Sequence, residues 1–208
     1  GGIALTYAHI GHYSGLLFFG KESLGARKIN VYSMPKMSFF LKNNGPWSQL
    51  IQEKNIIINE LKNDSIQNLS KYISIKPILV PHRDEFSETV GYLIKGDAKS
   101  ALFLPDIDKW EKWDKKIEDL VRNVDYAFID GTFYNGKEIP HRNMNEIPHP
   151  FVIETLERLK NLKKKHKKKV YFIHLNHTNP LLKPNSEITK EIIKRGYNIA
   201  RTGMKFDL

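Results

Sequence analysis

The chain has 208 residues with 40% hydrophobic content, enough to bury one sizeable core, so we expect a single domain over residues 1–208. It has no cysteine, which excludes disulfides and thiolate zinc sites, and no apolar run of the roughly 20 residues that a membrane span needs. We therefore expect no membrane association, and the default compartment is the cytoplasm.

The formal net charge of +10 raises the question of nucleic-acid binding. Much of the excess lies in one lysine-rich run, residues 160–169, which closes a helical pattern and precedes an apolar strand. Lysines suit such a solvated helix end, and the run contains none of the aromatic side chains on which single-stranded nucleic acids stack. The sequence therefore predicts a solvent-exposed face and no nucleic-acid partner.

The first half of the chain is rich in β-strand patterns. It begins inside a strand-like segment at residues 3–5, so we expect an N-terminally incomplete protein. The patterns predict helices over 13–24 and 34–41, and strands over 31–32, 56–58 and 73–80. Strands over 90–94 and 101–104 flank Gly96 and Asp97, which predicts a hairpin.

Helices and strands alternate in the second half. Helices are predicted over 110–121, over 148–162 with a proline at the start, and over 186–194 between the cap Ser186 and Gly196. Strands are predicted over 126–129 and 170–175, with short strands around Ile199 and Phe206. This order indicates an α/β (α+β) protein with helices packed outside stacked sheets.

Potential metal ligands recur at the ends of these strands. A lone histidine at a strand end is usually structural, but the recurrence of the pattern along one chain favours a site, because loops on a rigid scaffold carry function. The strand-end residues are His9, His12, His82, Asp106, Asp130 and His174.

The remaining histidines are interpreted differently. His141 and His149 lie beside prolines in a polar loop and His166 lies in the lysine run, so we predict no functional role for them. His177 is a candidate either for orienting a ligand by a hydrogen bond or for facing the substrate. Asp130 could equally contact a ligand or hold the turn that follows it.

These residues resemble the metallo-β-lactamase superfamily, whose members carry a His-x-His-x-Asp-His motif, then a lone His, an Asp and a final His at strand ends. The match is closest to the branch of the pyrroloquinoline quinone biosynthesis B proteins. It extends over nearly the whole chain and is carried by the His-rich turn, by Asp106, by residues 130–133 (Asp-Gly-Thr-Phe) and by residues 174–180 (His-Leu-Asn-His-Thr-Asn-Pro). The resemblance implies an αββα sandwich of two stacked mixed sheets, with its first strands missing here.

The chain also departs from the family motif. Tyr7 stands where the superfamily has its first histidine, and Gly11 stands where it has the aspartate. The quinone-biosynthesis proteins differ as well, with acidic residues at the position of His9. We therefore expect a weakened or mononuclear site.

The resemblance implies two half-sites that share Asp106 as a bridging carboxylate. One would use His9 and His82, with Tyr7 as a weak oxygen ligand, and the other would use His12 and His174. Each half-site offers two imidazoles and one carboxylate, which can hold zinc, one ion or two, or iron(II). The candidate catalytic residues are Asp106, His177 and Tyr7.

Three functions follow from this interpretation. The leading hypothesis is a metal-dependent hydrolase in which metal-bound water attacks a small-molecule substrate. The first alternative is a non-haem iron oxygenase or hydroxylase related to pyrroloquinoline quinone biosynthesis. The second is a non-catalytic member that binds metal or ligand without turnover. The sequence predicts neither the substrate nor the oligomeric state.

Overall fold

The computed structural model describes residues 1–139, 141 and 143–208. The backbone forms two compact units, which are treated separately below. Unit 1 comprises Gly1–Leu79 and Arg83–Val90, and unit 2 comprises Val80–His82 and Gly91–Leu208. The expectation of a single domain stays a prediction.

Unit 1 contains a parallel three-stranded sheet in the order β1-β2-β3, formed by Gly2–Ala4, Ile29–Ser33 and Ile56–Glu60. Its helices are α1 (Ile10–Tyr13), the 3-10 helix η1 (Ser14–Phe19), α2 (Pro35–Asn43) and α3 (Trp47–Gln52). Strands β4 (Gln67–Asn68) and β5 (Ser74–Leu79) pair antiparallel. Val31, Met37 and Leu41 are at most 1% exposed and anchor the core between sheet and helices.

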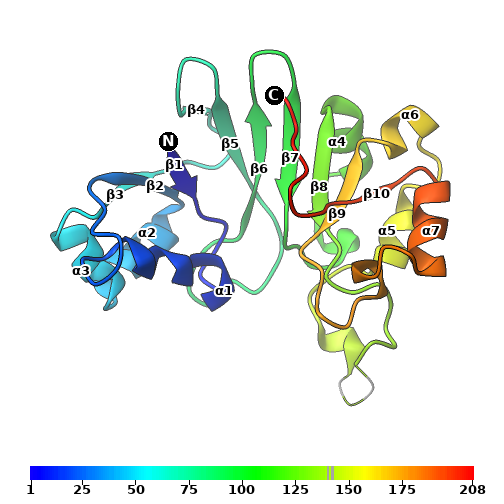
Figure 1. Ribbon diagram of the computed structural model, residues 1–208, viewed down its shortest axis with the longest axis horizontal. Helices are drawn as coiled ribbons and strands as arrows, with labels where there is room; N and C mark the ends of the chain where they lie inside the picture. Colours follow the sequence, from blue (N-terminus) through cyan, green and yellow to red (C-terminus); the bar gives the residue numbers. More distant parts are fainter. Residues whose placement is uncertain (140, 142) are drawn as a thin grey trace. The chain divides into compact units, whose positions relative to one another are not determined.

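Unit 2 is built on strands in the order β10-β9-β8-β7-β6 (Figure 1). Strands β7 to β10 run parallel, and β6 pairs antiparallel with β7 through the hairpin predicted at Gly96. The strands are β6 (Val90–Lys95), β7 (Ser100–Leu104), β8 (Tyr126–Asp130), β9 (Val170–Ile173) and β10 (Asn198–Ile199).

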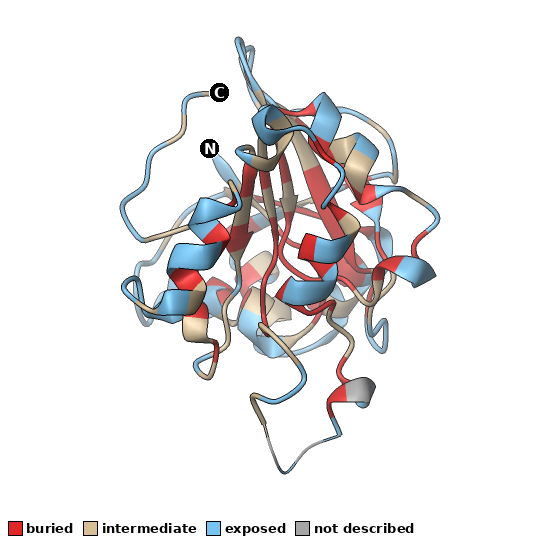
Figure 2. Ribbon diagram, turned by 90° about the vertical axis from the view of Figure 1, so that its right-hand side faces the viewer, coloured by how far each residue is buried: buried red, intermediate tan, exposed pale blue. Residues whose placement is uncertain are grey.

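The helices of unit 2 are short. Buried residues concentrate along the strands, and the helices keep exposed outer faces (Figure 2). The α-helices are α4 (Ile117–Asn123), α5 (Val152–Arg158), α6 (Lys164–Lys167) and α7 (Glu187–Lys194), and the 3-10 helices are η2 (Trp110–Lys112), η3 (Met144–Glu146) and η4 (Pro180–Leu182). None of the helices within the described residues is long and apolar enough to cross a membrane.

The helix predicted over 110–121 is interrupted. Trp110 and Trp113 are both buried, and Trp113 is extended, which places both indoles in the core at the expense of helical continuity. The indole nitrogen of Trp110 donates a hydrogen bond to Thr155 Oγ1 at 2.9 Å. Tertiary packing has overridden local propensity here.

Three further element predictions were wrong in part. The helical turns predicted over 13–24 begin at Ile10 and end at Gly20, whose backbone is extended. The helix predicted over 148–162 covers only α5, because Phe151 is still extended. Phe206 forms no strand and instead packs edge-on against the rings of Tyr126, Phe128 and Tyr171.

Helix α7 has the predicted ends. Ser186 caps it by accepting a hydrogen bond from the Thr189 backbone N–H at 3.1 Å, and Gly196 follows with φ of +91°. Replacing Ser186 by alanine is expected to lower the free energy of unfolding by about 1 kcal/mol, because the first turn loses its acceptor. Urea denaturation measures this change. Ser186→Asp keeps the acceptor, and a loss as large as that of Ser186→Ala would contradict the capping role.

Candidate metal centre

The parallel strands of unit 2 bring three predicted residues to one edge of the sheet. Asp106 follows β7, Asp130 ends β8 and His174 follows β9. Because the carboxyl ends of parallel strands meet at the same edge, residues far apart in sequence converge there. Within unit 2 these residues lie near one another, as the following distances show, and their role as a metal site stays a prediction.

Asp106 is the central carboxylate of this group. It is 1% exposed. Its Oδ2 lies 3.5 Å from His174 Nε2, and its Oδ1 lies 3.4 Å from His149 Nδ1. A buried carboxylate with one imidazole against each oxygen offers the nitrogen and oxygen donors that zinc and iron(II) use.

His174 is held in an uncommon backbone conformation. Its φ is +59°, in the left-handed region that side chains with a Cβ rarely adopt. Thr132 Oγ1 lies 2.9 Å from His174 Nδ1, which leaves Nε2 on the side of Asp106. A hydrogen bond to one ring nitrogen fixes the tautomer and aims the other nitrogen, as in many metal-binding histidines.

Asp130 holds the turn that follows it, which is one of the two roles considered for it. Its Oδ1 accepts hydrogen bonds from Thr132 N at 2.9 Å and Thr132 Oγ1 at 2.7 Å, which hold the turn. Its Oδ2 lies 2.7 Å from His149 Nδ1. Asp130 is fully buried, so this contact is shielded from solvent.

His149 is the functional candidate that the sequence prediction missed. Its side chain is 13% exposed and lies against both Asp130 and Asp106. Burial opposes protonation of the ring, but the charges of Asp130, Asp106 and Asp108 outweigh it and raise the pKa of His149 above its ordinary value. The neighbouring carboxylates thus favour the protonated ring more than water alone would. The prolines beside His149 indicate an ordinary loop histidine, and no local sequence pattern predicts that His149 contacts two carboxylates.

His82 lies beside this cluster. The Pro81 carbonyl accepts a hydrogen bond from Asp108 N at 2.7 Å, which ties the segment of His82 to the loop of Asp106. The rings of His82 and His149 are 5.3 Å apart. His82, Asp106 and His149 each offer one potential ligand atom, and these three atoms lie within 4.8 Å of one another.

A buried asparagine connects the two sequence segments that carried the family resemblance. Asn179 is 2% exposed, and its Nδ2 donates to the carbonyls of Gly131 (2.7 Å) and Thr132 (3.1 Å). Its Oδ1 accepts from Leu181 N at 2.9 Å. The segment after β9 therefore fastens the turn from which Thr132 reaches His174.

The predicted residues of unit 1 lie close to one another. Tyr7 is 3% exposed, and its ring lies 4.4 Å from that of His9 and 4.5 Å from that of His12. His12 Nδ1 lies 3.0 Å from Thr6 Oγ1. His9 Nε2 lies 3.2 Å from Glu85 Oε2.

Glu85 thus lies within hydrogen-bond distance of the His9 imidazole. A hydrogen bond from its own backbone, together with those from His9 and Arg83, lowers the pKa of Glu85 to about 2. The assignment of His9, His12 and Tyr7 to a metal site stays a prediction, as does the catalytic role of His177, whose side chain is exposed.

A family model described as a beta-lactamase superfamily domain matches residues 1–175. The chain belongs to the beta-lactamase superfamily. One curated relative in the superfamily is coenzyme PQQ synthesis protein B of Azotobacter vinelandii, 28% identical over 145 residues, which cover 65% of this chain and 46% of that protein. The chain thus spans about half the length of this relative.

Solved structures share the fold of this chain. Zn²⁺-bound PqqB from Methylobacterium extorquens superposes with a TM-score of 0.80 at 18% identity, covering 100% of this chain and 71% of that one. Igni18, a metallo hydrolase from Ignicoccus hospitalis, superposes with a TM-score of 0.58 at 15% identity, covering 95% and 73%. The predicted metallo-β-lactamase-like fold and the likeness to the PqqB branch are confirmed.

Proposed function

We propose that the chain is a metal-dependent hydrolase acting on a small-molecule substrate, with Asp106 as the central ligand. The observation that carries the proposal is the burial of this carboxylate between His149 and His174 at one edge of the sheet of unit 2. Burial of a carboxylate is costly, and a divalent cation bound by Asp106 would offset that cost. His82 and His174 are the proposed partner ligands.

The donor set fits zinc or iron(II). Two imidazoles and one carboxylate are a common ligand set of catalytic zinc and also of non-haem iron. When bound, zinc supplies a water ligand whose pKa is lowered to about 7, which is the nucleophile of many hydrolases. His9 and His12 remain proposed as further ligands through the family motif, and Tyr7 as a weak one.

The residues around Asp106 have separate proposed roles in orienting a ligand and in holding a proton. Thr132 lies against Nδ1 of His174, which leaves Nε2 facing Asp106, where it would serve as a ligand. His149 has its Nδ1 toward two carboxylates, which favours the protonated ring. We assign His149 the role of holding a proton for the leaving group, with Asp130 as its positioning residue. His177 stays a proposed substrate contact.

A second candidate is an iron-dependent hydroxylase in quinone-cofactor biosynthesis. The relative from Azotobacter vinelandii is named coenzyme PQQ synthesis protein B, and this observation favours a biosynthetic role. The same two histidines and one carboxylate are the facial triad of iron(II) oxygenases. The proposed location of either enzyme is the cytoplasm.

Metal analysis separates these candidates. The protein is purified with and without oxygen, its metals are counted, and it is assayed on an activated ester and an activated phosphodiester. About one or two zinc equivalents with chelator-sensitive hydrolysis support the hydrolase. About one iron equivalent without hydrolysis supports the hydroxylase. Absence of metal after anaerobic purification contradicts both and leaves only a binding role.

His149→Gln should separate metal binding from proton transfer. The variant is expected to retain most of its bound metal but to lose about 100-fold in hydrolytic rate, because glutamine cannot carry the proton. Metal content and the hydrolysis rate are measured on the same samples. Loss of metal in His149→Gln, comparable to that in His174→Ala, would instead make His149 a ligand.

A further inference from the structure

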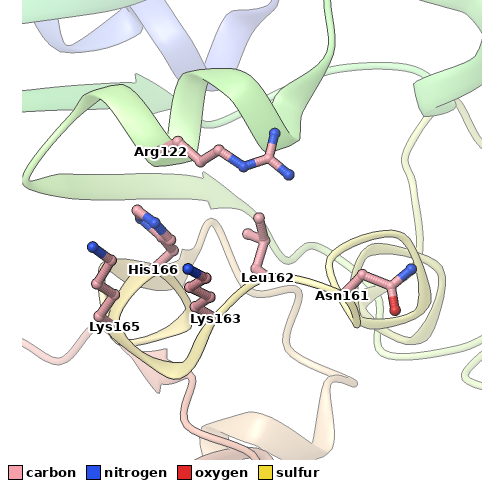
Figure 3. A pocket seen from close by; sticks show the side chains of 6 residues that line it. All are labelled: Arg122, Asn161, Leu162, Lys163, Lys165 and His166. Carbon is pink, nitrogen blue, oxygen red and sulfur yellow. The ribbon is translucent and has the colours of Figure 1, made fainter.

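A second cluster of basic side chains lies in unit 2, among residues outside the metal centre. A pocket of about 300 Å³ lies between the end of helix α4 and α6 with the segment that precedes it. Arg122 projects from one wall, and Lys163, Lys165 and His166 rise from the other (Figure 3). We call this the basic pocket; its lining residues are Arg122, Asn161, Leu162, Lys163, Lys165 and His166.

The charge of the basic pocket is poorly compensated. None of its six lining residues is acidic. Asp119 approaches one edge of the Arg122 guanidinium, with 2.5 Å between Oδ1 and Nη1. Within the described part of the chain, Lys163 and Lys165 form no ion pair. Lys169 places a further cation near Arg122, because its Nζ donates a hydrogen bond to the Arg122 carbonyl at 3.0 Å.

The pKa and the hydrogen bonding of His166 reflect the positive charge of the basic pocket. Its Nδ1 is buried and finds no hydrogen-bond partner among the residues that the structure describes. Burial of the ring, followed by the charges of Lys169, Lys165, Arg122 and Lys163, lowers the pKa of His166. The imidazole is therefore neutral near neutral pH and can donate one N–H without adding to the repulsion.

We propose that the basic pocket binds the phosphate group of a small anionic ligand. A guanidinium can bind two phosphate oxygens at once, and lysines act as additional point charges. The volume lies at the lower limit of small-molecule pockets, so it suits a phosphate with a small attached group. No Phe, Tyr or Trp side chain lines the pocket, which disfavours stacking of nucleotide bases.

The test is calorimetric titration of the full chain in phosphate-free buffer at constant ionic strength. Inorganic phosphate and glycerol phosphate are the two probes, and chloride is the reference. We expect saturable binding, weakened about tenfold or more by Arg122→Gln and by Lys165→Gln, because each removes a charge-assisted hydrogen bond. Preference for one probe distinguishes free phosphate from a phosphate ester as the ligand.

Lys183→Gln is the matched control, since it removes the same charge from an exposed position outside the pocket. It is expected to change the affinity less than about twofold. The second readout is the NMR resonance of the His166 imidazole, which is identified by its absence in His166→Gln. The pKa of His166, followed through this resonance, should rise when phosphate binds. Absence of saturable binding, equal weakening by Lys183→Gln, or phosphate binding that Arg122→Gln leaves unchanged would each overturn the proposal.

Discussion

Alanine in place of Asp106 is expected to remove most of the bound metal from the purified protein. Asp106 is 1% exposed and presents one oxygen toward His174 and the other toward His149, so its loss removes the only charged ligand proposed in unit 2. Because binding requires the anionic carboxylate, metal affinity should fall by several orders of magnitude. Metal content by mass spectrometry of the dialysed protein measures the effect. His174→Ala should act in the same direction.

The control for this experiment is His166→Ala. It removes an imidazole from the basic pocket and should leave the metal content unchanged. Circular dichroism of each variant separates loss of metal from loss of folding. Equal metal content in Asp106→Ala, His174→Ala and His166→Ala would refute the metal centre, whereas a folded Asp106→Ala without metal supports it.

Asn179→Ala is expected to be the most destabilising of the proposed single substitutions. The side chain is buried and makes three hydrogen bonds, to the carbonyls of Gly131 and Thr132 and from Leu181 N. Alanine removes these bonds from the Gly131 carbonyl and the Leu181 N–H, whereas the Thr132 carbonyl still accepts from Asn176 N. An unsatisfied buried group costs about 1–3 kcal/mol where water does not reach it. We therefore expect a loss of about 3 kcal/mol in the free energy of unfolding, measured by urea denaturation of the metal-free protein.

Asn68→Ala is the matched control, because Asn68 is exposed on β4. Its effect should be within about 0.5 kcal/mol. The substitution at Asn179 should also weaken metal binding, since Thr132 loses its fixed position beside His174. A stability change at Asn179 no larger than that at Asn68 would contradict the fastening role.

Sequence patterns predicted those parts of the site that depend on strand ends. A run of apolar residues fixes a buried strand, so a polar residue at its end must lie at the sheet edge, as Asp106 and His174 do. His149 could not be found in this way, because it lies in a loop and acquires its partners only when the chain between β8 and α5 folds back onto Asp130.

The same distinction explains the helix predictions. Helix α7 has its cap and its terminating glycine within one local segment, and both were predicted. The helix expected over 110–121 failed because burial of two tryptophans depends on distant neighbours such as Thr155. The lysine run was correctly expected to be exposed, but its approach to Arg122 across the basic pocket depends on the tertiary fold.

The fastening of the turn by Asn179 has a consequence for local opening of the chain. Gly131 N donates to the Ile173 carbonyl and Asn176 N donates to the Thr132 carbonyl, so backbone and side-chain bonds join the same two segments. These amides should exchange with deuterium in one cooperative event, since opening either segment breaks the bonds of the other. His174 would then leave its left-handed conformation only when the whole turn opens.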